Sequence, residues 1–240
     1  MVLGLEETSI PTAFYSVDTH HHCGVHKYMA HVFDYAFVAQ KDYIPEFEAI
    51  GAEAFWLPLY ASRFIEASNE KKYGAVFVGT MDAKLNPDRV KFFEALKQKV
   101  PVMTMTGEFW KIFPFSEIVI NQTVKGDLNF RVFEAMMSGS LLLIEASPNG
   151  LLDLFKDGEH LVTYEKNNID DAAKKIISCL QDVRHSRDIA RNGRNEILAK
   201  HLPFHRANFI LECTKDLKKK NSNQKFFSHA LSLSALSRKL

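Results

Sequence analysis

The segment Asp127–Gly139, with the sequence DLNFRVFEAMMSG, has residue types and spacing suited to binding a diphosphate. We expect a helix over Leu128–Ser138, in which Asn129 and Arg131 lie in the first turn. Free amides at a helix N-terminus bind anions, and a guanidinium can hold a phosphate through two parallel hydrogen bonds. Glu134 lies one turn further along, where its carboxylate can accept two ribose hydroxyls. The segment therefore indicates a nucleoside diphosphate site.

A purely structural interpretation of the same segment stays open. Four of its apolar residues are plausible core positions of a helix, namely Val132, Phe133, Met136 and Met137. Arg131 and Glu134 are three positions apart, which is also the spacing of an ordinary ion pair on a helix surface. Helical spacing alone does not separate the two interpretations.

A second polar group is the run Asp18–His22, with the sequence DTHHH, followed by His26 and His31. Imidazoles and carboxylates are common metal ligands. We read the run as extended chain, in which consecutive side chains point to alternate sides and seldom share one ion. We therefore predict no bound metal. Two alternatives remain: an exposed polar loop, or a catalytic role for His20, with Asp18 orienting it or acting on the acceptor directly.

Strand-like and helix-like segments alternate along most of the chain. Predicted strands cover residues 11–17, 33–39, 54–59, 73–79, 100–105, 117–121, 140–146 and 161–164, and predicted helices cover residues 41–51, 87–99, 128–138, 151–155, 170–182 and 186–200. Repeated strand–helix units of this length predict a parallel sheet with helices on both faces. Pro58 cannot donate a hydrogen bond to a neighbouring strand, so its strand lies at a sheet edge or leaves the sheet.

The composition is that of a globular protein, with 46% apolar residues and a net charge of +1. So small a charge gives no general field that attracts nucleic acid or anionic lipid. Three widely spaced cysteines without a C-x-x-C pair suggest neither a disulfide framework nor a zinc site. No basic-then-apolar leader and no apolar run of membrane-spanning length occur. We predict a cytoplasmic protein without a transmembrane segment or a nucleic-acid partner.

The pattern breaks between Leu59 and Lys72, where the polar stretch Ala67–Lys72 lies, so we place a domain boundary in this region. Residues 1–62 are expected to form a partial N-terminal lobe, residues 63–212 a binding domain, and residues 213–240 a tail. In the tail, one apolar helix face is expected that packs on the body, contacts a partner or lies on a membrane surface. Its residues are Phe227, Ala230, Leu231 and Leu236.

Several motifs in order resemble one enzyme group. FEAMMSGSLLLIEA resembles the E-A-M-A-x-G segment of retaining glycosyltransferases of the GT-B fold, and N-x-R-V-F-E-A with G-L-x-x-L-F-x-D-G-E-x-L-V-x-Y resembles its CgeB-like, spore-maturation branch. The resemblance runs from about Pro11 to Leu211. It implies an α/β, GT-B-like architecture: a Rossmann-type parallel sheet in the C-terminal domain and a partial N-terminal α/β lobe. It also implies sugar transfer from a nucleoside-diphosphate sugar to an acceptor hydroxyl, without a cofactor.

The resemblance assigns roles to individual residues. Glu134 falls where the family binds the nucleotide ribose, and Gly79 falls where backbone approaches the phosphates. Asn149 and Gly150 fall in the loop whose amides face the donor sugar. His20 matches a histidine that ends a strand of the first domain and faces the donor.

Two departures from the family pattern concern the donor site. The broader group has a glutamate eight positions before Glu134, whereas this chain has Gly126, with Asp127 beside it as a possible substitute. The usual arginine and lysine pair after the glycine of the first strand is also missing. The chain offers Thr80, Lys84 and Arg89 in that region, and we choose Lys84 as a phosphate contact alongside the better placed Arg131.

The N-terminal lobe is too short to match a complete family member. Two strand runs and one or two helices cannot bury both faces of a sheet, so we expect the lobe to leave aromatic residues exposed and to favour a homodimer. These residues are Phe14, Phe33, Tyr35 and Phe37. The rival hypothesis is a truncated, non-catalytic nucleotide-sugar-binding or scaffold protein. The sequence does not indicate the base, the sugar, the acceptor or the stereochemistry.

Overall fold

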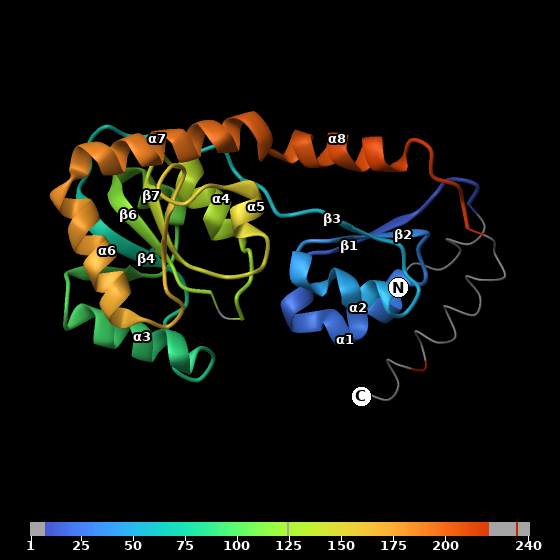
Figure 1. Cartoon of the computed structure of the whole chain (residues 1–240), viewed down its shortest axis with the longest axis horizontal. Helices are drawn as coiled ribbons and strands as arrows, with labels where there is room; N and C mark the ends of the chain where they lie inside the picture. The colour runs from blue at the N-terminus through green and yellow to red at the C-terminus, as the bar shows by residue number, and fades with distance from the viewer. Residues whose placement is uncertain (1–7, 124, 221–233, 235–240) are drawn as a thin grey trace. The chain divides into compact units, whose positions relative to one another are not determined.

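The computed structural model describes residues 8–123, 125–220 and 234. Backbone contacts divide the chain into two compact units (Figure 1). The central unit comprises residues 60–205, and the N-terminal unit comprises residues 1–59 together with residues 206–240. The contacts therefore place one division between Leu59 and Tyr60 and another between His205 and Arg206, and they group residues 206–220 with residues 8–59. The helix expected around Phe227–Leu236 lies outside the described residues.

The central unit is built on a five-stranded sheet in the order β5-β4-β6-β7-β8, and every neighbouring pair is parallel. This confirms the prediction of a parallel sheet. Its strands are β4 (Tyr73–Val78), β5 (Val102–Met105), β6 (Ser116–Asn121), β7 (Leu141–Glu145) and β8 (Val162–Tyr164). Its helices are α3 (Pro87–Lys97), η2 (Phe109–Lys111), η3 (Phe113–Phe115), α4 (Phe130–Met137), α5 (Leu151–Leu154), α6 (Ile169–Gln181) and α7 (Val183–Lys200).

Helices cover both faces of this sheet, as Figure 1 shows. Phe77 and Ile118 point to the face on which α3 and α6 pack, and Phe93 and Ile176 belong to the same core cluster. Alternate strand residues such as Val119 are also fully buried and point to the other face, where α4 and α7 pack. Burial on both faces explains why these strands read as continuous apolar runs.

The N-terminal unit contains a three-stranded parallel sheet in the order β1-β2-β3. Its elements are β1 (Ala13–Ser16), α1 (Thr19–Ala30), β2 (Tyr35–Val38), η1 (Lys41–Tyr43), α2 (Ile44–Glu48) and β3 (Ala54–Trp56). The helix α8 (Pro203–Thr214) follows α7, and from Arg206 onwards it groups with this unit. The edge position expected for the strand before Pro58 is confirmed, because β3 is an edge strand that ends at Trp56.

The extended conformation predicted for the histidine run is wrong. Residues 19–30 form α1, whose first turn is closed by hydrogen bonds from the amides of His21 and His22 to the carbonyl of Asp18. The Thr19 hydroxyl donates to the carbonyl of Ser16 (2.9 Å) and is buried. Only Thr19 and Ala30 of this helix are buried. So narrow a buried face leaves no apolar periodicity in the sequence, which is why the helix was not predicted.

The expectation that Tyr35 and Phe37 are exposed is also wrong. Both side chains are buried. The Tyr35 hydroxyl donates to the carbonyl of Lys218 (2.7 Å), and the ring of Phe37 meets Phe209 of α8 at 6.5 Å between centroids. The chain thus covers this face of the sheet with its own C-terminal part. Two of the aromatic residues that motivated a homodimer are therefore not available for one.

Buried Asp34 fixes the same C-terminal segment. Its Oδ1 accepts from the amide of Lys220 (2.7 Å), and its Oδ2 accepts from the amide and the hydroxyl of Thr12 (2.6 and 2.8 Å). The ammonium of Lys219 lies 3.7 Å from Oδ2. One carboxylate therefore joins the strand region at the start of the chain to residues near its end.

Gly193 allows α7 to approach α4 closely. A Cβ at this position would overlap the carbonyl oxygen of His160 and lie 3.2 Å from the sulfur of Met136. Because the nearest obstacle is backbone, it cannot move aside as a flexible side chain would.

We predict that Gly193→Ala lowers the free energy of unfolding by about 1–3 kcal/mol through overpacking. Helix propensity alone would give the opposite sign, a gain of roughly 1 kcal/mol. Urea unfolding followed by circular dichroism measures the difference. Asn192→Ala, on the exposed face of the same helix, serves as the control and should be neutral or slightly stabilising. An equally stabilised Gly193→Ala would contradict the close approach.

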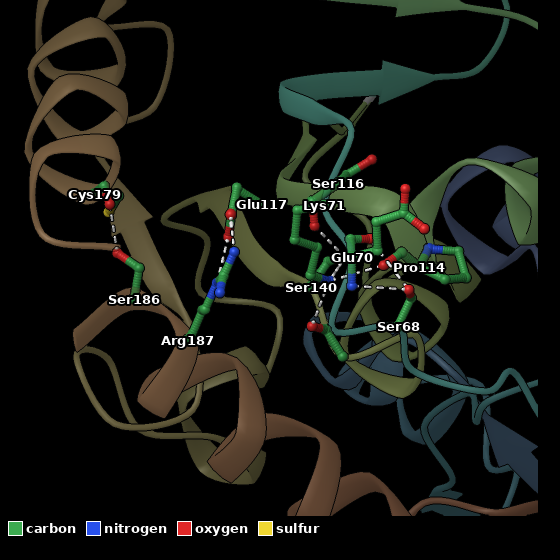
Figure 2. A network of polar contacts seen from close by, with 11 residues as sticks. Ser68, Glu70, Lys71, Pro114, Ser116, Glu117, Ser140, Cys179, Ser186 and Arg187 are labelled. Carbon is green, nitrogen blue, oxygen red and sulfur yellow. Dashed lines mark hydrogen bonds and ion pairs between the residues drawn. The ribbon is translucent and has the colours of Figure 1, made fainter. Parts of the chain in front are cut away.

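Lys71 joins three segments at the edge of the sheet where the strands begin (Figure 2). Its ammonium donates to the carbonyls of Pro114 (2.9 Å) and Gly139 (3.1 Å) and to the Ser140 hydroxyl (3.5 Å). Gly139 follows the last turn of α4, where a positive charge is favourable. Burial lowers the pKa of Lys71 to about 8, although the nearby Glu117 acts in the opposite direction.

This pKa predicts a specific pH dependence of stability. Between about pH 8 and pH 10 the folded protein releases the Lys71 proton while the unfolded chain retains it, so this lysine makes unfolding less favourable as pH rises. Lys71→Met lacks the titration and leaves buried carbonyls without a donor. We expect the variant to be less stable at pH 8, and the deficit relative to the wild type to grow towards pH 10. A deficit independent of pH in urea titrations would contradict the lowered pKa.

Candidate functional site

Polar residues of the central unit gather where its parallel strands end. Gly79 directly follows β4, Asn121 ends β6 and Glu145 ends β7. Asn129 is the N-cap residue of α4, which begins at the same edge of the sheet. The carboxyl edge of a parallel sheet, with helix N-termini facing it, is the usual ligand site of such folds.

Arg131 lies across this edge. Its Nε donates to the carbonyl of Val78 (3.1 Å) and its Nη1 donates to Oδ1 of Asn121 (2.9 Å). The guanidinium is 4.7 Å from the centre of the Phe77 ring. Asn121 in turn donates to Oδ1 of Asn129 (3.0 Å). These contacts fix the direction of the guanidinium and tie the start of α4 to the ends of β4 and β6.

Gly79 is required by this arrangement. A Cβ at this position would lie 2.7 Å from Nη2 of Arg131 and 2.8 Å from Cζ of Phe77. The Nη2 atom makes no hydrogen bond to the described residues. The sequence placed Gly79 at a point of close approach to phosphate, and in the structure the group that approaches it is the Arg131 guanidinium.

Arg89, near the start of α3, lies on the same aromatic ring. It is 8% exposed, its Nε donates to Oε1 of Gln122 (3.0 Å), and its Nη2 donates to the carbonyl of Gln122 (3.1 Å). Its guanidinium is 5.2 Å from the centre of Phe77. We call Arg89, Arg131 and Phe77 the two-arginine cluster.

The positive charges of the two-arginine cluster are not paired directly with a carboxylate among the described residues, although Asp127, Glu134 and Glu145 act on them at longer range. Within the described part of the chain, neither guanidinium forms a salt bridge, since their partners are carbonyls and amides. Burial lowers the pKa of Arg131 to about 10, the charge of Arg89 lowers it further, and Glu134 and Asp127 act against the shift. Burial also lowers the pKa of Arg89, and the charges of Asp127 and Glu145 act against this shift. An anion at this edge would relieve the repulsion, so the cluster is suited to bind one.

Glu134 lies in α4, one turn after Arg131, and is 8% exposed. Its Oε1 accepts a short hydrogen bond from the Ser62 hydroxyl. Burial raises the pKa of Glu134, while the Ser62 bond and the charges of Arg131 and Arg63 lower it. The carboxylate is thus held at the site but is not paired directly with an arginine.

The loop before α4 is held by side chains from the next strand–helix connection. The amide of Asn149 donates to the carbonyl of Gly126 (2.5 Å), and the Ser147 hydroxyl donates to the same carbonyl (3.0 Å). Gly126 has a φ of +75°, and a Cβ there would lie 3.0 Å from the Ser147 oxygen. A glutamate in place of Gly126 would therefore be strained, which accounts for its absence. Neighbouring Asp127 is buried and acts electrostatically on both arginines.

Two other predicted residues, Lys84 and Gly150, lie in loops of the central unit. Lys84 is exposed in the loop between β4 and α3, with its amide bonded to Asp82 (2.7 Å), so the buried cation from this region is Arg89. Gly150 precedes α5 with a φ of +94°, which favours glycine.

In the N-terminal unit, Asp18 and His20 lie at the carboxyl end of β1, where α1 begins. The Asp18 side chain does not cap the helix, and its charge raises the pKa of His26, which burial and His22 lower. The charge of His20 acts instead on Asp42, where it opposes a pKa raised by desolvation. Asp42 follows β2 and was not among the predicted residues.

Among the described residues, no group of three histidine, cysteine or acidic side chains is arranged to hold a metal ion. No helix in the same part of the chain is long and apolar enough to cross a membrane.

Sequence reasoning missed the partners that orient the predicted residues, above all Asn121, Gln122 and Ser62. Asn121 and Gln122 stand at the polar end of an apolar strand, and this signal was available in the sequence. Ser62 had no such signal, because its contact with Glu134 spans 72 positions.

Comparison with known proteins identifies the family and the fold of the chain. The model of a family described as glycosyl transferase-like matches residues 61–212. No curated protein matches the chain. Solved structures that share the fold include TarM, with a TM-score of 0.61 and 14% identity over 78% of this chain and 44% of TarM. The chain therefore spans less than half the length of TarM.

Two further structures are similar. HepE from Anabaena, solved in complex with UDP-glucose, has a TM-score of 0.68 and 12% identity over 86% of this chain and 72% of HepE. Sucrose-phosphate synthase from Thermosynechococcus elongatus has a TM-score of 0.60 and 12% identity over 79% of this chain and 59% of that enzyme. The fold is thus the expected GT-B-like α/β fold with Rossmann-type parallel sheets. Because the family model matches more than half of its residues, the chain belongs to the glycosyl transferase-like family.

Proposed function

We propose that the central unit binds a nucleoside-diphosphate sugar and that the chain takes part in transferring the sugar to an acceptor hydroxyl. The observation that carries the proposal is the two-arginine cluster, in which two guanidiniums share one ring without a carboxylate partner. The negative charge of a diphosphate is complementary to these two guanidiniums. The UDP-glucose bound by HepE is a ligand of this class.

Each predicted donor residue has a place in this proposal. Arg131 and Arg89 bind the diphosphate, with Asn129 and the amides of α4 beside them, and Gly79 leaves room for the guanidinium. Glu134 accepts the ribose hydroxyls. Asn149 and Gly150 shape the loop for the donor sugar, and the carboxylate of Asp127 partly offsets the positive charge of the two arginines. Lys84 remains a peripheral candidate for phosphate.

The reaction we propose breaks the bond between the anomeric carbon and the diphosphate oxygen and forms a bond from that carbon to the acceptor oxygen. The acceptor hydroxyl gives its proton to a base, for which His20 or Asp18 is the candidate, and the proton then passes to solvent, while the diphosphate leaves with the electron pair of the broken bond. The arginines stabilise the charge on the leaving group. His20, with Asp18 or Asp42, is the candidate for contact with the reacting groups in the N-terminal unit. We propose no metal or organic cofactor.

We further propose the CgeB-like branch and a cytoplasmic location. The motifs N-x-R-V-F-E-A and D-G-E-x-L-V-x-Y support the first. The three free thiols of Cys23, Cys179 and Cys213 support the second. The competing function is donor binding without turnover, which an assay of the reaction separates from enzymatic transfer.

The two-arginine cluster gives the first test. Arg131→Gln and Arg89→Gln should each weaken binding of uridine diphosphate by about 1.5–3 kcal/mol, roughly ten- to a hundredfold, because each removes charged hydrogen bonds. Arg131→Lys keeps the charge but loses the planar fork, so its loss should be intermediate. Calorimetry measures the affinity, and thermal unfolding checks that the variants fold.

Arg191→Gln provides the matched control, because Arg191 is an exposed arginine of α7 paired with Asp188. It should bind uridine diphosphate as the wild type does. Absence of binding at millimolar uridine, guanosine and thymidine diphosphates would refute the donor site.

His20 gives the second test, which concerns turnover. His20→Gln should lower hydrolysis and transfer of UDP-glucose by roughly a hundredfold or more, the scale of a lost acid–base group. The affinity for uridine diphosphate should stay within about twofold, because the residues proposed to bind it all lie in the central unit. His185→Gln, an exposed histidine of α7, is the control. Treatment with a chelator should leave the rate unchanged.

Turnover by the wild type and His20→Gln at the same rate would remove His20 from the reaction. Tight binding without any turnover, tested with several donor sugars and acceptors, would favour the non-catalytic function.

A further inference from the structure

Residues 60–65, which begin the central unit, are fixed along its nucleotide-site helix α4. Tyr60 packs its ring against Phe130 at 5.7 Å, with the two planes 87° apart. The amide of Ala61 donates to the carbonyl of His201 (2.9 Å), and Ser62 donates to Glu134. Further along, Arg194 donates to the carbonyl of Ile65 (2.7 Å). The segment is therefore held against α4 and the C-terminal part of α7.

The contact between Ser62 and Glu134 uses only one carboxylate oxygen. Oε1 accepts the Ser62 hydroxyl, whereas Oε2 accepts no hydrogen bond from the described residues. Glu134 as a whole is buried, with 8% of its surface exposed, but Oε2 is not among the fully buried side-chain atoms that lack a partner. A bond to Oε1 fixes the rotation of the carboxylate and leaves Oε2 for another donor.

The environment of Glu134 also makes its ionisation depend on neighbours. Burial favours the protonated acid, and the Ser62 hydroxyl is the first of the groups that favour the carboxylate. Two vicinal hydroxyls need acceptors, and only the ionised group offers acceptor sites on both oxygens. Loss of the serine would therefore affect both the direction and the charge of this acceptor.

We propose that Ser62 is a positioning residue that holds Glu134 as an oriented carboxylate acceptor for the ribose of the bound nucleotide. The proposal rests on the proposed function, and it assigns recognition of ribose over deoxyribose to a residue at the start of the central unit. A purely structural role, in which Ser62 only ties residues 60–65 to α4, predicts lower stability but unchanged recognition of the sugar.

The test compares uridine diphosphate with 2′-deoxyuridine diphosphate by calorimetry at pH 7. The wild type should prefer the ribonucleotide by about tenfold, the factor that corresponds to roughly 1.4 kcal/mol. Ser62→Ala should bind the ribonucleotide about tenfold more weakly and reduce the preference to less than about threefold. Ser62→Thr keeps the hydroxyl and should restore most of the preference.

Ser68→Ala is the matched control, because Ser68 lies shortly after residues 60–65 but donates to the carbonyl of Glu70 and not to α4. It should retain the preference of the wild type. Thermal unfolding of each variant records any loss of stability separately from the binding ratio.

The outcomes separate the two proposals. A wild type that binds no nucleoside diphosphate overturns the proposed function and this inference together. A wild type that binds and discriminates, with a Ser62→Ala variant that keeps the same ratio, overturns only the role of Ser62. A Ser62→Ala variant that is less stable but equally discriminating supports the purely structural role and has the same consequence.

Discussion

The central unit depends on an electrostatic constraint at one edge of its sheet: two guanidiniums on one phenylalanine ring. Arg89 comes from α3 and Arg131 from α4, and Phe77 of β4 lies within 5.2 and 4.7 Å of them. Two positive charges in a partly buried place repel each other, and burial adds a desolvation cost. Their backbone and amide hydrogen bonds orient the charges without neutralising them.

This constraint explains the residue types at several positions that the fold alone would not determine. Gly79 has no side chain because the guanidinium of Arg131 occupies the space. Asn121 and Gln122 supply neutral acceptors where a carboxylate would have cancelled the charge. Asp127 is buried nearby but forms no salt bridge with either arginine, so its negative charge offsets their positive charge only at longer range. A group that develops negative charge during a reaction is best stabilised by such fixed dipoles and cations.

Much of the central unit could be predicted from sequence because its information is local. Strands buried on both faces are continuous apolar runs, and the helix carrying Asn129, Arg131 and Glu134 was recognisable from one short segment. Several partners of these residues were not local. Arg131 reaches the carbonyl of Val78 only because β6, which precedes α4, lies beside β4 in the sheet, and a sequence does not state strand order directly.

The N-terminal unit shows the same limit more strongly. The hydroxyl of Tyr35 donates to the carbonyl of Lys218, which lies 183 positions further along the chain. The burial of that face of the sheet therefore depends on a segment that the sequence indicated only as a tail. The helix α1 buries only two residues and gave no periodic signal. The sequence contains both Lys84 and Arg89 as possible phosphate contacts in this region. Burial distinguishes the two residues, and burial depends on how α3 packs.

The helix α4 is held at both ends, and this determines how accurately it can present its polar residues. Asn129 is bonded to Asn121 at the start, and Lys71 bonds to the carbonyl that follows the last turn. Between them, Gly193 lets α7 pack close to Met136. A binding group that is already fixed loses little conformational freedom when a ligand arrives, so more of each contact contributes to affinity. The hydrogen bond from Ser62 restricts the Glu134 carboxylate in the same way. This restriction matters because a glutamate side chain has several rotamers even when its helix does not move.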